Sequence, residues 1–142
     1  GGHLRVIAGS FAGQAGPAQT FTPMNVWDLR LKAGRATGLE VPEGHNAVLV
    51  VLNDAVRVNG TDDVPASRYA VFAQTGGGIT VEAQAPEVKC LLLTGEPLNE
   101  PIAGYGPFVM NTEDEIRQAF KDYQQGLFGT VAAVTRSVNQ GH

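Results

Sequence analysis

Turn-forming residues recur every eight to twelve residues between short apolar stretches, and this spacing limits the possible folds more than any other feature. The turn signals lie at 33–34, 42–44, 53–54, 59–60 and 76–78. Short strands bounded by regular turn signals are typical of a β-sandwich or a small barrel. The Asn-Asp pair at 53–54 indicates a tight hairpin, and the Asn-Gly pair at 59–60 indicates a type I′ turn. We therefore expect an all-β fold.

The segment 24–32 has the clearest strand pattern, because apolar and polar side chains alternate along it. Trp27, Leu29 and Leu31 fall on one face, which predicts a strand of an antiparallel sheet with one buried side. Trp27 is accordingly interpreted as a core residue. Further short strands are expected at 4–8, 39–41, 47–52, 56–58, 68–73, 79–83 and 88–93.

One helix is predicted after the strands, over residues 112–126. Thr112 has the position of an N-cap, and Glu115 three residues later completes a capping box. Apolar residues at helical spacing form one face of this helix, namely Ile116, Ala119, Phe120 and Tyr123. Gly126 is placed to end the helix.

Composition excludes several classes of protein. The chain has 142 residues, 43% of them hydrophobic and 17% charged, which suits one globular domain. The net charge is −4, and Lys32 and Arg35 are the nearest approach to a basic cluster, so we expect no nucleic-acid binding. The longest apolar runs are too short to span a membrane, and the first residues do not resemble a signal peptide. With Cys90 as its one cysteine, the chain is expected in the cytoplasm.

The spacing of strands and turns resembles that of the cupins, which are double-stranded β-helix (jelly-roll) barrels. The cupin pattern supplies two His, a Glu and a further His as ligands of a divalent metal. Placed on this sequence, the pattern puts the Glu ligand at Ala47 and the last His at Ala70. The paired His positions fall on Glu40 and Pro42, or on Val41 and Glu43. We therefore predict no metal ligand and no catalytic residue in this chain.

Two further residues invite a functional interpretation. His45 lies near the cupin pattern but out of register, and a hydrogen-bonding role at a strand edge is expected for it. Cys90 lies among apolar neighbours, which predicts an inert buried thiol.

The segment from Gly95 to Gly126 reads G-E-P-L-N-E-P-I-A-G-Y-G-P-F-V-M-N-T-E-D-E-I-R-Q-A-F-K-D-Y-Q-Q-G. It resembles the C-terminal region of the pirin family almost throughout. L-R-V-I-A-G at 4–9 and V-P-E-G-H-N-A at 41–47 are similar too, so that the resemblance covers residues 3–129. Pirins have two cupin barrels with the metal in the N-terminal one, and they are associated with quercetin 2,3-dioxygenase-like activity and with transcriptional co-regulation.

The resemblance implies a metal-free C-terminal barrel with no cofactor of its own. A divalent transition metal, expected to be iron, would belong to an N-terminal barrel absent from this chain. One hypothesis is a structural and interaction role that supports that barrel. The alternative is a part of a quercetin 2,3-dioxygenase-like oxidoreductase whose catalysis resides in the missing domain, and the chain alone is then no enzyme. A small-molecule binder that uses the barrel mouth is a third possibility.

The sequence predicts one domain overall, although its parts differ in character. These parts are an N-terminal strand and arm (1–22), a metal-free barrel (23–94), an extended arm (95–111), the helix (112–126) and a tail (127–142).

The arm and the helix together carry more contiguous apolar surface than a lone soluble domain exposes. This surface packs either on the chain's own barrel or on a partner. The expected partner is the N-terminal cupin domain of the same parent protein, or a symmetry mate in its absence. The interface candidates are Tyr105, Pro107, Phe108, Met110, Ile116, Phe120 and Tyr123.

Overall fold

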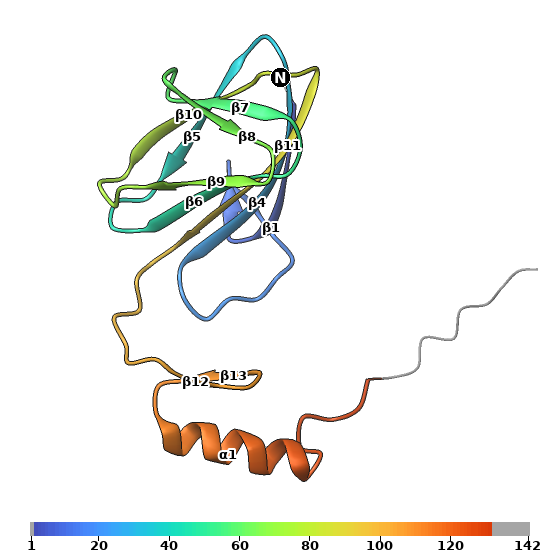
Figure 1. The fold of residues 1–142 in the computed structure, drawn as a ribbon, viewed down its shortest axis with the longest axis vertical. Coiled ribbons are helices and arrows are strands. Elements are labelled where there is room, and N and C mark those ends of the chain that lie inside the picture. The colour runs from blue at the N-terminus through green and yellow to red at the C-terminus, as the bar shows by residue number, and fades with distance from the viewer. Residues whose placement is uncertain (1, 132–142) are drawn as a thin grey trace, which may run out of the picture. The chain divides into compact units, whose positions relative to one another are not determined.

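The fold, taken from a computed structural model, is described for residues 2–131 and is built mostly of strands (Figure 1). The strands are β1 (Gly2–Ala8), β2 (Ser10–Phe11), β3 (Gln14–Ala15), β4 (Met24–Lys32), β5 (Ala36–Val41), β6 (Asn46–Val51), β7 (Ala55–Val58), β8 (Asp62–Pro65), β9 (Arg68–Phe72), β10 (Gly77–Ala83), β11 (Glu87–Gly95), β12 (Ala103–Tyr105) and β13 (Phe108–Met110). The helix α1 spans Glu113–Gln124. The all-β fold with one C-terminal helix is confirmed.

Two antiparallel sheets form the barrel. One has five strands in the order β1-β4-β11-β6-β9, and the other has four in the order β5-β10-β7-β8. Buried aliphatic side chains from both sheets pack into one core, as the alternation of residues along each strand requires. Those with no exposed surface include Leu39, Leu49, Val51, Val56, Val81, Val88 and Leu92.

The predicted strand at 24–32 is confirmed as β4. Trp27, Leu29 and Leu31 are buried, as the alternating pattern indicates. The Trp27 ring meets the ring of Phe11 edge-on, with 5.0 Å between the centroids. Phe11 lies in the small β2–β3 hairpin, within the segment expected to be an N-terminal strand and arm.

The predicted hairpin at Asn53-Asp54 is wrong. β6 belongs to the five-stranded sheet and β7 to the four-stranded sheet, so this turn carries the chain from one sheet to the other. The Asn53 side chain fixes the crossing, because its Oδ1 accepts from the Lys89 backbone N–H at 2.7 Å. Its Nδ2 also donates to the Glu87 carbonyl at 3.2 Å.

The predicted turn at Asn59-Gly60 is confirmed. Both residues have positive φ, 50° and 73°, as a type I′ turn requires. The turn joins β7 to β8. The strand β8 is not among the predicted strands.

The chain divides into two compact units, one up to Leu98 and one from Asn99 onward. The first unit holds the barrel. The second holds α1 and the β12–β13 hairpin, which lies within the segment expected to be an extended arm. In the tail predicted over 127–142, residues 132–142 lie outside the described part of the chain.

The end signals of the helix are confirmed. Thr112 is the N-cap, and its capping box with Glu115 is complete. Gly126 follows the C-cap with φ of 72°, a conformation that glycine adopts without strain. No helix in residues 2–131 has both the length and the apolar character needed to cross a membrane.

Candidate interaction site

Of the barrel positions at which the cupin pattern places metal ligands, those that face the core carry alanine or valine. Ala47 is fully buried and Val41 points into the core. Ala70 is half-buried against the same core. Glu40 lies on the exposed side of β5, away from the interior. The interior of this barrel therefore does not fit a divalent metal.

The two histidines within residues 2–131 lie on different parts of the barrel, one on a strand and one in a turn. His45 lies in the turn between β5 and β6, where its backbone N–H donates to the Pro42 carbonyl at 3.2 Å. Its buried Nδ1 has no hydrogen-bond partner among residues 2–131. His3 is exposed on β1, and His142 lies outside the described residues. Within residues 2–131 no three His, Cys, Asp or Glu side chains come close enough to hold a metal ion.

Cys90 is buried between the sheets, as predicted. Loss of hydration raises the pKa of its thiol to about 11, so the thiol stays protonated at neutral pH. A protonated thiol is neither a nucleophile nor a metal ligand. Cys90 therefore fills space in the core.

All seven predicted interface residues lie in the second unit. Phe108 of β13 meets Phe120 of α1 edge-on, with 4.9 Å between the ring centroids. Tyr105 of β12 also meets Phe120, at 5.7 Å. Tyr123 and Phe128 extend the contact, at 6.4 and 5.9 Å from Phe108. These five rings form the aromatic cluster that attaches the hairpin to the helix.

Polar contacts hold the approach to the helix. The Asn111 side chain donates to Glu100 Oε2 at 2.7 Å and to the Pro101 carbonyl at 3.1 Å. Glu115 Oε2 accepts from the backbone N–H groups of Asn111 and Thr112, at 3.1 and 2.9 Å. The segment before the helix is therefore fixed to the helix N-terminus. These contacts also fix the position of the hairpin.

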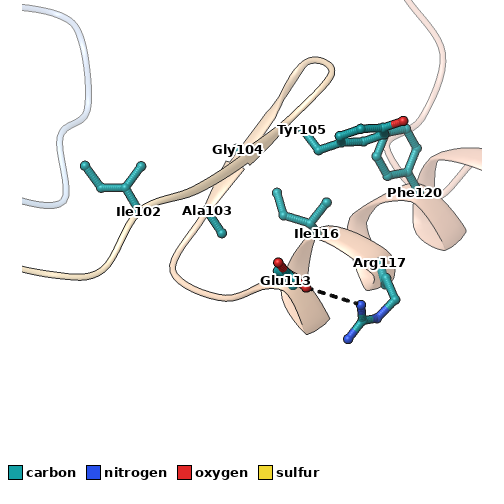
Figure 2. A pocket seen from close by; sticks show the side chains of 8 residues that line it. All are labelled: Ile102, Ala103, Gly104, Tyr105, Glu113, Ile116, Arg117 and Phe120. Atoms are coloured by element: carbon teal, nitrogen blue, oxygen red, sulfur yellow. Dashed lines mark ion pairs between the residues drawn. The ribbon is translucent and has the colours of Figure 1, made fainter.

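An open pocket with a volume of about 440 Å³ lies between the hairpin and the helix (Figure 2). Its lining residues are Ile102, Ala103, Gly104, Tyr105, Glu113, Ile116, Arg117 and Phe120. Figure 2 shows the Tyr105 and Phe120 rings lying together beside Ile116, with the charged side chains at one edge. That edge is an ion pair between Glu113 and Arg117, 3.8 Å apart. An apolar groove with a charged rim can bind a partner side chain.

The predicted interface residues differ in exposure. Ile116 is buried, whereas Tyr105 and Tyr123 are 71% and 65% exposed. Phe108, Met110 and Phe120 are half-buried, and Pro107 is exposed at the hairpin turn.

Ile102 and Phe128 are not among the predicted interface residues. Ile102 is 84% exposed and lines the pocket, and Phe128 belongs to the aromatic cluster. Ile102 could have been found from the sequence, because it is a large apolar residue between Pro101 and Ala103 in the predicted arm.

Two sheets of this order around an aliphatic core define a cupin barrel. The family described as the pirin C-terminal cupin domain matches residues 26–129. The chain therefore belongs to the pirin family.

Relatives agree with this assignment. The chain is 44% identical over 127 residues to a Pseudomonas aeruginosa protein named "Putative quercetin 2,3-dioxygenase PA2418", covering 89% of this chain and 44% of that protein. It is 33% identical to pirin-like protein 2 of Arabidopsis thaliana, covering 91% of this chain and 42% of that protein. The chain spans about half the length of these curated relatives.

A solved structure supports the fold. The crystal structure of quercetin 2,3-dioxygenase from Acinetobacter baumannii matches with a TM-score of 0.83 at 48% identity. The match covers 93% of this chain and 46% of that one.

Proposed function

We propose that this chain is a metal-free C-terminal cupin domain with a structural and interaction role. Its partner is a metal-bearing N-terminal cupin barrel of the same parent protein, and the contact surface is the second unit. In this proposal the divalent transition metal, iron, belongs to the partner barrel. The half-length coverage of the relatives supports a parent protein with another domain of similar size.

The observation that carries the proposal is the small number of buried side chains in the second unit. Of its described residues, 99–131, only Ile116 and Ala119 are buried. Small folded units with so little buried apolar surface are rarely stable without disulfides, metals or a partner. Ile102, Tyr105 and Val109 remain exposed beside the pocket or on the hairpin. A protein surface that covers them supplies the missing burial.

The partner contact predicts a change in the hydrogen exchange of the helix. The test compares the chain alone with a chimera in which residues 3–129 replace the matched segment of the Pseudomonas relative. We expect the α1 amides to exchange roughly tenfold or more slowly in the chimera, because docking stabilises the helix against local opening. The central strand β11 is the internal control, since its amides lie in the barrel core in both proteins. Equal exchange of α1 in the two proteins would contradict the proposal.

A second candidate function is favoured by the names of the relatives. In this alternative the chain is part of a quercetin 2,3-dioxygenase-like oxidoreductase whose metal and catalysis reside in the N-terminal domain. We predict that the chain alone, supplied with iron, does not consume quercetin, because the inward positions of its barrel are aliphatic. Loss of quercetin absorbance is the measurement, with the full-length Acinetobacter protein as the positive control. Turnover by the chain alone would contradict the structural role, and turnover by the chimera alone would favour the alternative.

A further inference from the structure

The turn between β7 and β8 contains the one Asn-Gly pair of the sequence, Asn59-Gly60. Both residues are exposed, and their positive φ values give the turn its type I′ geometry. The Thr61 backbone N–H closes the turn by donating to the Val58 carbonyl at 3.1 Å. Within residues 2–131 the Gly60 backbone N–H makes no hydrogen bond, so its nitrogen is free to react.

An asparagine followed by glycine can lose its side-chain amide without an enzyme. The Gly60 nitrogen attacks Asn59 Cγ, the bond from Cγ to Nδ2 breaks, and ammonia leaves with the proton of the Gly60 N–H. Water then opens the resulting five-membered succinimide at either carbonyl, which gives aspartate or isoaspartate. Glycine favours the attack because it has no Cβ beside the nitrogen. The exposed turn supplies the water.

The folded chain opposes this reaction through a clamp between Asn59 and Thr80 of β10. The Asn59 backbone N–H donates to the Thr80 carbonyl at 2.9 Å, and Asn59 Oδ1 accepts from the Thr80 backbone N–H at 3.0 Å. The turn geometry adds to the clamp, because a ψ of about +30° at Asn59 keeps its Cβ and the Gly60 nitrogen on opposite sides of the Cα–C bond. Ring closure therefore requires the turn to open first.

The two products differ in what they do to the sheet. Aspartate at position 59 keeps the length of the turn, and its carboxylate can accept from the Thr80 N–H as Asn59 Oδ1 does. Isoaspartate carries the main chain through the former side chain, which adds a carbon to the turn and shortens the arm that reaches Thr80. The turn and its clamp are then lost together. β8 is an edge strand that pairs only with β7 in its sheet, so this loss releases it.

We propose that Asn59 is a site of spontaneous deamidation that opens with the β7–β8 hairpin, and that its isoaspartyl product detaches β8. Detachment makes β7 the new edge of the four-stranded sheet, and an uncovered edge can pair with another chain. The barrel would thus lose its monomeric state with age through one turn. The inference is independent of the proposed function, because the turn lies in the first unit.

The rate of deamidation tests the site. Trypsin cleaves after Arg57 and Arg68, so Asn59 is the sole asparagine of peptide 58–68. Mass spectrometry of this peptide follows the change from amide to carboxyl, and chromatography separates the two acidic products. In mildly alkaline buffer we expect the folded chain to react at least roughly tenfold more slowly than the free peptide 58–68. The chain in urea should react as fast as the peptide.

Hydrogen exchange of the Thr80 N–H measures the opening independently. The ratio of the folded to the free-peptide deamidation rate should equal the opened fraction at Thr80 within about threefold, because both reactions need the same opening. Asn53 is the internal control. It is also a turn residue whose Oδ1 accepts a backbone N–H, that of Lys89, but Asp54 follows it instead of glycine. It should remain an amide over the same period.

The purified isoaspartyl chain tests the consequence for β8. Its β8 amides should exchange at least roughly tenfold faster than those of the unmodified chain, and its apparent mass in solution should rise with concentration. The substitution Asn59→Asp is the matched control, because it adds the same charge without lengthening the turn. Its β8 amides should exchange as in the unmodified chain.

Three results would overturn the inference. Deamidation of the folded chain at the rate of the peptide would show that the clamp gives no protection. A rate far below the opened fraction at Thr80 would show that the reaction needs global unfolding and not the opening of one turn. Unchanged exchange of β8 in the isoaspartyl chain would show that the strand stays in the sheet.

Discussion

Replacing Phe120 with alanine is expected to melt residues 99–131 of the isolated chain while the barrel keeps its thermal transition. Phe120 is the residue at which the hairpin and the helix meet, since its ring contacts both Tyr105 and Phe108. Removing a large, partly buried aromatic side chain costs about 2 kcal/mol of unfolding free energy. A unit with two buried residues has little stability to lose. Circular dichroism at 222 nm measures the loss of helix.

Tyr123→Ala is the matched control for this substitution. Tyr123 lies on the same helix and is 65% exposed, so its removal should change the helix signal much less. If Phe120→Ala keeps the full helix signal, the aromatic cluster does not hold the unit together. The surface proposed for the partner would then need another source of rigidity.

A second large effect is expected in the barrel, where Leu92→Ala should lower the unfolding free energy by about 3 kcal/mol. Leu92 has no exposed surface and lies in β11, the middle strand of the five-stranded sheet. Truncation leaves a cavity that the surrounding aliphatic side chains fill only in part. The midpoint of thermal unfolding should fall by roughly 10 °C or more.

Leu93→Ala provides the control one residue along the same strand. Leu93 points to the outer face and is 37% exposed, so the same truncation should cost less than about 1 kcal/mol in the isolated chain. Equal losses for the two variants would show that the inward and outward faces of β11 are assigned wrongly. Urea unfolding followed by tryptophan fluorescence can measure both, because Trp27 lies in the core.

The local elements of this fold could be predicted from the sequence because their causes are local. Alternation places Trp27 in the core, and the capping box of Thr112 and Glu115 fixes the start of the helix. The turn at Asn53-Asp54 could not be assigned in this way. The turn signal is the same whether the next strand joins the same sheet or the opposite one, and the choice depends on pairing with β10 and β11 far along the chain.

The candidate site was predicted in part. The apolar arm and helix were selected as a surface from their composition, but the sequence does not reveal the hairpin that creates the pocket. That hairpin depends on contacts of Phe108 and Tyr105 with Phe120, which periodicity alone does not indicate. The outward-facing apolar residues of the five-stranded sheet cannot be identified from the sequence for a different reason. Val48, Val50 and Leu91 lie in fully apolar runs, and such runs do not distinguish the inward from the outward face.

The place of β11 in the sheet determines when the barrel can form during synthesis. It is the last strand of the barrel along the chain, yet it lies in the middle of the five-stranded sheet, between β4 and β6. Until residues 87–95 leave the ribosome, the strands made earlier have no central strand to pair with. The barrel therefore folds late and through contacts distant in sequence, which makes its folding slow. Its half-made sheets stay open to aggregation and to chaperones until then.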